Sequence, residues 1–249
     1  ARAFWKSMER ILITGSSGFY GQALIAAIRR EYPAAAICGL DIVAPGANPP
    51  DQFETCDITS PRLADSMAAF RPDTVVHLAF VVNPMRDEKR MHDINVNGTR
   101  NLLAAVSNTK PARVMASSSA TAYGAWPDNC IPLTETHPLR TRTEYRYAAD
   151  KFQVEGLMQN FAVTHPEVLV SWTRPCMIYG PGMSNFMTSL FTMPPVLPLP
   201  GSDNPPMQFV HLDDVAEASL AILSANLQGP FNVAPLDWFT MKDLARMRG

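Results

Sequence analysis

Short apolar runs alternate with longer amphipathic stretches along the first two-thirds of the chain. Runs rich in Val, Ile and Leu are typical of buried strands, and apolar residues three or four positions apart are typical of helices that cover a sheet. The pattern predicts strands at residues 10–14, 36–41, 53–56, 74–78, 113–117 and 168–173. It predicts helices at residues 19–31, 61–70, 88–107 and 144–165. This alternation favours an α/β fold in which helices cover both faces of a doubly wound parallel sheet.

The pattern changes after residue 179. Seven of the 22 prolines lie between residues 180 and 206, and because proline lacks a backbone N–H, we expect a small irregular lobe there. Beyond it the pattern predicts strands at 208–210 and 231–233, and helices at 213–224 and from 241 onward. We therefore divide the chain into a domain at 8–179 and a C-terminal lobe at 180–249, from which residues 208–224 return to the first domain. Because the chain stops inside the last predicted helix, we expect its C-terminus to be truncated.

The formal net charge of -2 and a pI of about 6.2 argue against a nucleic-acid partner. No apolar run approaches the roughly 18 residues that a membrane-spanning helix needs, and the first residues lack the apolar core of a secretory signal. The four cysteines show no C-x-x-C spacing, and the five histidines are scattered. We therefore expect free thiols, no metal site, no membrane association and a cytoplasmic location.

A glycine-punctuated turn joins the first predicted strand to the first helix. Gly15, Gly18 and Gly21 follow the spacing Gly-x-x-Gly-x-x-Gly. Glycine allows a positive φ, a close approach of the backbone to a phosphate, and tight packing of the helix on the strand. The N–H groups at the start of the helix attract an anion. The turn alone is a weak signal, but its place between strand and helix predicts a pyrophosphate site in a Rossmann-type domain.

Asp41 ends the second predicted strand, about twenty residues beyond the glycines. A carboxylate at this point accepts hydrogen bonds from the ribose hydroxyls of NAD and repels the 2′-phosphate of NADP. No arginine follows in residues 42–45, which also favours NAD. The alternative is a turn or helix-cap aspartate that has no role in cofactor binding.

Tyr147 and Lys151 stand one helical turn apart in the helix predicted at 144–165, so they share a face. A tyrosine with a pKa near 10 is a poor base at neutral pH, and a lysine at this spacing is expected to favour the phenolate and to lower that pKa. Residues 117–119, all serines, end the fifth strand, where α/β sheets bind their ligands. A hydroxyl there can hydrogen-bond a reacting oxygen. The alternative for the Tyr–Lys pair is a solvated helix face.

Together these motifs resemble the extended short-chain dehydrogenases/reductases of the NAD-dependent epimerase/dehydratase family. The resemblance covers nearly the whole chain. The matching segments are residues 14–21, 56–58, 77–79, 95–103, 117–124, 147–151, 174–175, 179–182 and 209–216. It implies a Rossmann-type domain with NAD as cofactor, a small-molecule substrate held by the C-terminal lobe, and a homodimer. The dimer would form through a four-helix interface of the helices predicted at 88–107 and 144–165.

The resemblance also implies roles for single residues. Tyr147 would be the general acid/base, Lys151 would also hold the nicotinamide ribose, and Ser119 would orient the substrate oxygen. The residues implied in cofactor binding are Gly15, Ser17, Gly18, Phe19, Tyr20, Gly21, Asp41, Asp57, Ile58, Leu78, Ala79, Phe80, Asn95, Ser117, Tyr147, Lys151, Pro175 and Ile178. For Asn95, a structural hydrogen-bonding role is an equal alternative.

Two positions depart from the pattern of the nucleotide-sugar members of that family. Met177 stands where those members carry an asparagine for the substrate's phosphates, and Met207 stands where they often carry an arginine. A diphosphate that lacks cationic or donor partners is held poorly, and an apolar wall suits an apolar ligand. The residues expected to contact substrate are Val81, Val82, Ser119, Met177, Phe186, Met187 and Met207.

Two alternatives to this apolar site stay open. The apolar residues could instead pack the core of the lobe itself. Four arginines could still serve an anionic substrate, although a solvated surface position is the alternative for each of them. They are Arg86, Arg90, Arg140 and Arg142.

Three functions follow from these observations. The first is an NAD-dependent oxidoreductase that transfers a hydride between NAD and a secondary alcohol or ketone of a mostly apolar small molecule. The second is a nucleotide-sugar epimerase or dehydratase that recycles a tightly bound NAD. The third is an NAD-binding protein without catalytic activity, against which the complete set of Ser119, Tyr147 and Lys151 argues. Net turnover of added NAD separates the first function from the second.

Overall fold

The computed structural model describes residues 8–184 and 206–248. Its centre is a sheet of seven parallel strands in the order β3-β2-β1-β4-β5-β6-β9. The strands are β1 (Arg10–Thr14), β2 (Ala36–Asp41), β3 (Gln52–Thr55), β4 (Thr74–His77), β5 (Arg113–Ser117), β6 (Leu169–Pro175) and β9 (Gly229–Val233). The strand order reverses between β1 and β4, and the carboxyl ends of parallel strands form a ligand crevice at such a reversal.

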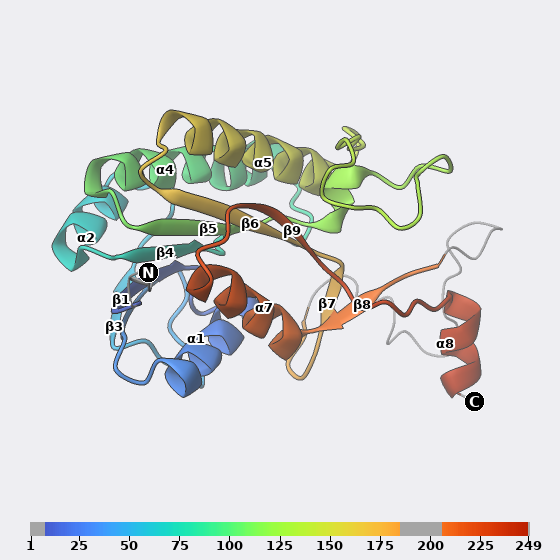
Figure 1. The fold of residues 1–249 in the computed structure, drawn as a ribbon, viewed down its shortest axis with the longest axis horizontal. Helices are drawn as coiled ribbons and strands as arrows, with labels where there is room; N and C mark the ends of the chain where they lie inside the picture. Colours follow the sequence, from blue (N-terminus) through green and yellow to red (C-terminus); the bar gives the residue numbers. More distant parts are fainter. Residues whose placement is uncertain (1–7, 185–205, 249) are drawn as a thin grey trace, which may run out of the picture.

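Helices cover both faces of this sheet (Figure 1). One face carries α2 (Arg62–Phe70), α4 (Gly98–Thr109) and α5 (Arg146–Thr164). The other face carries α1 (Phe19–Glu31) and α7 (Leu212–Ser224), which pack against each other. This arrangement confirms the predicted doubly wound α/β fold.

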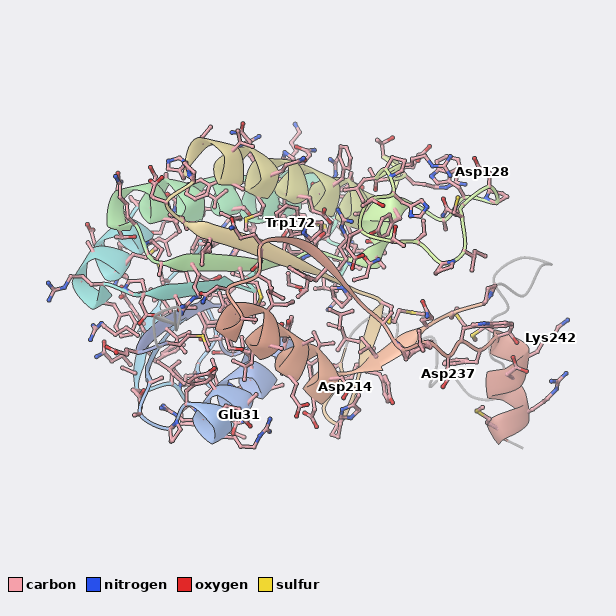
Figure 2. The ribbon with its side chains drawn as sticks, in the orientation of Figure 1. Glu31, Asp128, Trp172, Asp214, Asp237 and Lys242 are labelled. Carbon is pink, nitrogen blue, oxygen red and sulfur yellow. The ribbon has the colours of Figure 1, made fainter. Side chains whose placement is uncertain are left out.

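Each face of the sheet has its own apolar core. Leu102 and Val106 of α4 pack with Met158 of α5 in one fully buried cluster, and Leu24 and Ile28 of α1 belong to the cluster on the opposite face. Charged side chains such as Glu31 and Asp214 point away from the sheet, whereas Trp172 lies within the fold (Figure 2). The amphipathic pattern of the sequence therefore placed these helices correctly.

The single helix predicted at 88–107 is wrong in one respect. The structure divides it into α3 (Glu88–His92), a π-helical turn η1 (Asp93–Asn97) and α4. Such widened turns are frequent at functional sites. Here the turn contains Asn95, whose polar side chain is fully buried, and an apolar-periodicity pattern does not reveal one inserted residue.

A second, two-stranded parallel sheet was only half predicted. Its strands are β7 (Met177–Tyr179) and β8 (Phe209–His211). β7 was missed because three residues are too few for a pattern, and it becomes a strand only when residues 209–211 return beside it. A 3₁₀ turn η2 (Ala120–Tyr123) and the final helix α8 (Met241–Arg248) complete the described elements. Most of the predicted proline-rich lobe, residues 185–205, lies outside the part of the chain that the structure describes.

Candidate active site

The predicted site residues gather at the carboxyl edge of the sheet. The glycine turn follows β1, Asp41 ends β2, residues 78–80 follow β4, and Ser117 ends β5. Pro175 ends β6, and Ile178 lies on β7 immediately after it. The topology thus brings together residues that are more than 160 positions apart in the sequence.

The glycine turn has the shape that a phosphate needs. Gly15 has a φ of 72°, and a Cβ there would lie 2.6 Å from the backbone nitrogen of Ala79. A Cβ on Gly21 would collide with the carbonyl oxygen of Gly15. Gly18 caps α1 without any side-chain hydrogen bond, which leaves the helix N-terminus accessible to an anion. The turn therefore fits the pyrophosphate of a dinucleotide.

The Asp41 carboxylate is oriented by backbone donors. Its Oδ2 accepts a hydrogen bond of 2.9 Å from the Ser17 N–H, and its Oδ1 accepts one of 2.7 Å from the Ile42 N–H. A carboxylate offers about four acceptor positions, so capacity is left for ribose hydroxyls. Ile42 and Val43 follow it with exposed fractions of 67% and 61%, which places apolar rather than cationic groups beside the ribose position.

Asp57 and Ile58, which the resemblance implies in cofactor binding, occupy different environments. Burial raises the pKa of Asp57, but hydrogen bonds from Thr59 and the charge of Arg90 outweigh burial and lower it. Arg90 Nη2 lies 2.7 Å from Asp57 Oδ2. Ile58 is buried and faces Gly98, where any Cβ would collide with it. The sequence did not indicate the Asp57–Arg90 ion pair, which joins residues 33 positions apart.

The Tyr20 side chain is directed away from the cofactor edge. Its hydroxyl bonds to Ser219 Oγ and lies 3.4 Å from the Val215 carbonyl oxygen, both on α7. Burial raises the pKa of Tyr20 to about 12. For Tyr20, only the backbone N–H at the start of α1 is therefore suited to the cofactor role that the sequence predicted.

The predicted catalytic side chains lie together at the ends of β5 and α5. Lys151 is buried, and its Nζ donates a hydrogen bond of 2.6 Å to the Ser117 carbonyl oxygen. The same amine lies 3.5 Å from the centre of the Phe80 ring. The Phe80 ring meets the Tyr147 ring edge to face, with 5.6 Å between centres. Ser119 caps η2 and accepts a hydrogen bond of 3.2 Å from the Thr121 N–H.

Burial controls the ionisation of Tyr147 and Lys151. Burial raises the pKa of Tyr147 to about 12, although its hydrogen bond with Ser119 lowers it in part. Burial lowers the pKa of Lys151 to about 7, against the charges of Glu155 and Asp150, which raise it. The expected lowering of the tyrosine pKa by the lysine is therefore not found. Lys151 Nζ lies 5.7 Å from the Tyr147 ring centre and is directed at the Ser117 carbonyl and the Phe80 ring.

Asn95 contacts the wall of the predicted cofactor site rather than the predicted catalytic pair. Its Oδ1 accepts a hydrogen bond of 2.8 Å from the Val81 N–H, and its Nδ2 donates one of 3.0 Å to Asp150 Oδ2. Among the contacts of the described residues, none joins the Asn95 side chain to Tyr147 or Lys151. The structural alternative considered for Asn95 therefore has direct support.

A buried hydrogen-bonded chain supports the same wall and was not predicted. Thr14 Oγ1 lies 2.8 Å from His77 Nδ1, and His77 Nε2 lies 2.9 Å from Thr99 Oγ1. Thr14 Oγ1 also accepts from the Ala79 N–H at 3.4 Å. Burial lowers the pKa of His77 to about 3, so this histidine is neutral in the folded protein. The available signal was His77 itself, a polar residue that ends an apolar strand.

A second missed cluster lies beneath α5. Arg174 Nη2 lies 2.6 Å from Glu155 Oε2, and both side chains are buried. Glu155 also accepts hydrogen bonds from Ser118 and from Trp172 Nε1. Ser118 directly precedes Ser119, so this cluster anchors the segment after β5 against α5, which carries the predicted catalytic pair.

The residues predicted to contact substrate are only partly described. Val81 is half-buried and Val82 is 50% exposed beyond the β4 edge. Met177 pairs with Phe209 in the β7–β8 sheet, and the backbone of Met207 bridges to that of Phe239. Phe186 and Met187 lie outside the described residues.

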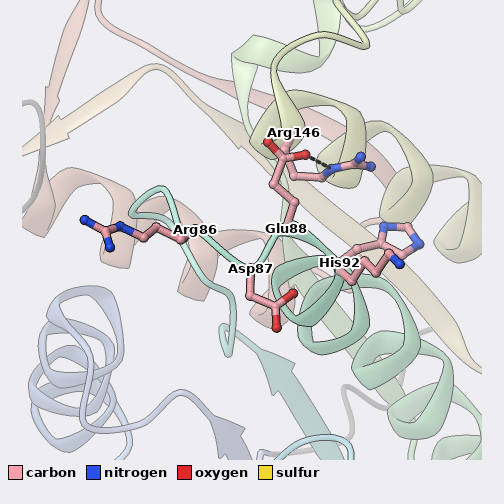
Figure 3. Close-up of a pocket in the computed structure, with 6 residues that line it drawn as sticks. Arg86, Asp87, Glu88, His92 and Arg146 are labelled. Atoms are coloured by element: carbon pink, nitrogen blue, oxygen red, sulfur yellow. Dashed lines mark hydrogen bonds and ion pairs between the residues drawn. The ribbon is translucent and has the colours of Figure 1, made fainter.

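A charged pocket of about 530 Å³ opens near the start of α5 (Figure 3). The residues that line it are Arg86, Asp87, Glu88, Lys89, His92 and Arg146. Glu88 and Arg146 form an ion pair of 3.4 Å across it, while Arg86 points away from them.

Residues 8–184 and 206–248 contain no group of three His, Cys, Asp or Glu side chains suited to a metal ion. None of their helices combines the length and the apolar character that crossing a bilayer requires.

Comparison with known proteins confirms the resemblance drawn from the motifs. The model of the NAD-dependent epimerase/dehydratase family, whose cofactor is NAD, matches residues 11–234. An uncharacterized protein of Mycobacterium tuberculosis is 25% identical over 231 residues, which cover 90% of this chain and 61% of that protein. A 3-diazoavenalumate denitrifying reductase of Streptomyces is 27% identical over 235 residues, which cover 90% of this chain and 75% of the reductase.

A solved structure shows the same fold. The UDP-glucose 4-epimerase of Thermus thermophilus, in complex with NAD, matches with a TM-score of 0.82 at 24% identity. The match covers 95% of this chain and 81% of the epimerase. The chain thus spans most of that structure but only about three-fifths of the length of the mycobacterial relative.

Proposed function

We propose that the chain, which belongs to the NAD-dependent epimerase/dehydratase family, interconverts a secondary alcohol and a ketone on a mostly apolar small molecule. Ser119, Tyr147 and Lys151 are the proposed catalytic residues. Residues 8–179 would bind NAD, and residues 180–249 would mainly form the substrate lobe. The similarity to a denitrifying reductase at 27% identity supports a net redox reaction.

One observation carries the choice of substrate. No Lys or Arg occurs between Arg174 and Lys242, so the proposed substrate lobe is almost without positive side chains. The same stretch contains five acidic residues, which are Asp203, Asp213, Asp214, Glu217 and Asp237. Diphosphates are held by cationic side chains and by hydrogen-bond donors. A lobe of this charge disfavours a nucleoside diphosphate and suits a neutral, apolar ligand.

Most of the arginines considered for an anionic substrate already have partners. Arg90 pairs with Asp57, and Arg140 pairs with Asp128 at 2.8 Å. Arg142 lies 4.0 Å from the centre of the Trp126 ring. Arg174, at the end of β6, is held by Glu155. To bind a diphosphate, these side chains would have to leave interactions that the fold already makes.

The proposed mechanism assigns one task to each catalytic side chain. NAD, when bound, supplies the chemistry of hydride transfer at its nicotinamide ring. Tyr147 exchanges a proton with the substrate oxygen, and the hydroxyl of Ser119 orients that oxygen by a hydrogen bond. Lys151 is proposed to hold the nicotinamide ribose. Burial of Ser119 and Lys151 keeps water from these two side chains and fixes their positions relative to Tyr147.

A nucleotide-sugar epimerase is the second candidate. Its support is the fold shared with the Thermus UDP-glucose 4-epimerase. The three proposed catalytic side chains could also carry out a transient oxidation of a sugar hydroxyl, as well as the net oxidation of an alcohol. Such an enzyme recycles its NAD, whereas a dehydrogenase consumes it. Turnover of any substrate would remove the third possibility, an NAD-binding protein without catalysis.

A ligand panel tests the proposal. In the presence of NAD, steroid, terpenoid and aromatic ketones or alcohols are expected to raise the melting temperature, because a ligand that binds only the folded state stabilises it. UDP-, GDP- and dTDP-sugars are expected to leave it unchanged. Micromolar binding of a nucleotide sugar would overturn this ranking and place the epimerase first.

A gain-of-function variant sharpens that test. Met207→Arg restores a cation at the position where nucleotide-sugar relatives often carry one, so it is expected to increase UDP-glucose affinity about tenfold, the effect of one charge-assisted hydrogen bond. Met85→Arg, on the exposed loop after β4, is the matched control and should leave affinity unchanged. Equal UDP-glucose affinity for both variants would show that residue 207 does not face a substrate phosphate.

We also propose that the protein is a homodimer. The helices α4 and α5 lie side by side on one outer face (Figure 1). On α5, Phe152 and Val163 are exposed to 42% and 76%. A four-helix contact between two copies would cover these apolar side chains.

A further inference from the structure

Asp150 is a buried carboxylate that the proposed reaction does not use. It directly precedes Lys151 on α5, and its side chain has no exposed surface. Its Oδ1 lies 2.7 Å from His92 Nδ1, and its Oδ2 accepts from Asn95 Nδ2 at 3.0 Å. Burying a carboxylate is costly unless it is fully hydrogen-bonded, and these two partners, 55 and 58 positions away, meet that need.

The carboxylate determines which way the Asn95 amide faces. An ionised carboxylate only accepts hydrogen bonds, whereas an amide has one donating and one accepting end. The donating NH₂ of Asn95 must therefore face Asp150. Its oxygen is then left to accept from the Val81 N–H, which it does at 2.8 Å.

This orientation fixes the segment that carries Phe80. The Val81 N–H is held by Asn95, and the Ala79 N–H is held by Thr14 Oγ1. Phe80 lies between these two anchors, and its ring contacts the Lys151 amine and the Tyr147 ring. The position of the ring beneath the catalytic pair thus depends on both backbone anchors.

We propose that Asp150 and His92 are positioning residues, which fix the Asn95 amide and through it seat Phe80 against Lys151 and Tyr147. The inference rests on the proposed function only in taking residues 79–81 as a wall of the NAD site. In the series of hydrogen-bonded side chains His92, Asp150 and Asn95, His92 lies nearest to solvent. Its side chain is 31% exposed and lines the charged pocket of Figure 3. The charged groups that face or share this pocket with His92 are Asp150, Arg146, Arg86, Asp87, Glu88 and Lys89.

A carboxylate at position 150 can accept a hydrogen bond from His92 in both of its charge states. The Nδ1–H of either a neutral or a protonated imidazole can donate to it. An asparagine at position 150 can hydrogen-bond only one of the two charge states of His92 while it also accepts from Asn95. Beside a neutral His92 that accepts through Nδ1, the new amide can still offer its oxygen to Asn95. Beside a protonated His92 it must offer that oxygen to the imidazole, so its NH₂ meets the NH₂ of Asn95, and the Val81 N–H loses its acceptor.

Asp150→Asn therefore turns the arrangement into one that depends on pH. Histidines change charge between about pH 5 and about pH 8. For this variant, NADH affinity measured by fluorescence should match wild type near pH 8 and fall roughly ten- to hundredfold below it near pH 5.5, since one buried hydrogen bond is lost. Asp93→Asn is the matched control. Asp93 lies on η1, is partly exposed and pairs with Arg90, so its loss should not produce the pH-dependent decrease.

A double variant tests whether His92 causes the acid-side loss. The substitution His92→Asn puts an amide where the imidazole places Nδ1, and an amide cannot be protonated in this pH range. Asp150→Asn combined with His92→Asn should therefore bind NADH with no acid-side loss relative to Asp93→Asn. Full affinity of Asp150→Asn at both pH values would overturn the proposal. Persistence of the acid-side loss in the double variant would also overturn it.

Two further measurements keep the proposal testable if Asp150→Asn does not fold, or if the wild-type protein does not bind NADH. With the wild-type carboxylate kept, His92→Asn should retain NADH affinity, because its amide can still donate to Asp150. His92→Leu leaves one oxygen of this buried carboxylate without a donor, which favours the protonated acid. The acid O–H can then bind the Asn95 oxygen and turn the amide away from Val81, so NADH affinity should fall about tenfold. Equal affinities of the two variants would contradict the positioning role. Without cofactor, exchange of the Val81 amide hydrogen, followed by NMR near pH 5.5, should be faster in Asp150→Asn or His92→Leu than in Asp93→Asn. Neither measurement needs a substrate. If the ketone panel fails, both measurements therefore still test the positioning role.

Discussion

Burial moves the pKa values of Tyr147 and Lys151 in opposite directions, to about 12 and about 7. In each case burial favours the neutral form of the group, because a charge loses hydration inside the protein. A tyrosine that keeps its proton at neutral pH is suited to donate it to a carbonyl oxygen. The shift therefore favours the acid role of Tyr147 in ketone reduction.

Tyr147→Phe is expected to lower turnover by at least about a thousandfold, because it removes only the hydroxyl that carries the proton. NAD affinity should stay within about twofold of wild type, since the ring and its contact with Phe80 remain. Tyr145→Phe is the control, because Tyr145 lies 5.7 Å from Tyr147 but is half exposed. Calorimetry with NAD and steady-state rates on an identified ketone would measure both quantities. A near-wild-type rate for Tyr147→Phe would refute the proton-transfer role.

Lys151 should make the free energy of unfolding depend on pH. A lysine in an unfolded chain titrates near pH 10.4, whereas burial lowers the pKa of Lys151 to about 7. Between these values the unfolded state binds more protons than the folded state, so the free energy of unfolding rises with pH. The destabilising effect of Lys151 is thus complete below about pH 7 and disappears toward about pH 10.

Lys151→Met is therefore expected to be more stable than wild type at pH 7, and the difference should narrow as the pH rises, by up to about 1.4 kcal/mol per pH unit. Urea unfolding at about pH 7 and about pH 9 would measure it, with the exposed Lys89→Met as control. A difference between wild type and Lys151→Met that stays constant with pH would mean that Lys151 is not desolvated.

At the scale of the elements, the Glu155–Arg174 ion pair joins α5, which carries the proposed catalytic pair, to β6, the strand beside the edge strand β9. Trp172 and Ser118 complete the hydrogen bonds of the same carboxylate. Helix α5, strand β6 and the segment that follows β5 therefore meet at one buried charge. Arg30 and Glu217 form a contrasting pair between α1 and α7, in which both side chains are more than half exposed.

Glu155→Ala is expected to destabilise the fold by about 3–5 kcal/mol, because it leaves the buried Arg174 without a counter-charge. Glu217→Ala, which breaks the exposed pair, is expected to cost at most about 1 kcal/mol. Urea denaturation midpoints at an unchanged slope would compare the two variants. Equal costs would mean that the α5–β6 pair is accessible to water in solution.

At the scale of the whole molecule, local pattern determined much of the fold. The bounds of β1, β2, β5 and α1 agree with the prediction, because apolar runs end there at charged residues, serines, glycines or prolines. The family followed from the motifs, and the fold brings the predicted catalytic side chains to one edge of the sheet. Roles in cofactor and substrate binding stay predictions.

What the sequence could not give depends on distant residues meeting. His92 and Asp150 are 58 positions apart and meet only because α3 packs on α5. β7 gains its partner only from the return of β8. The Tyr147 pKa was predicted in the wrong direction, because the spacing of Tyr147 and Lys151 says nothing about burial or about where the amine points.

The proposed dimer gives the last test. Stable interfaces bury about 1,200–2,000 Å² in total and are apolar at their centre. Helices α4 and α5 lie side by side on one face of the sheet, and Phe152 of α5 is 42% exposed. In sedimentation, the chain of 27.4 kDa is expected to behave as a species of twice that mass, and Phe152→Glu should shift it to the monomer, because a buried unpaired carboxylate opposes association. Ile131→Glu changes a side chain that is 89% exposed on a loop and should leave the dimer intact. A wild-type monomer at micromolar concentration, or equal masses for the two variants, would exclude an interface through this face of α5.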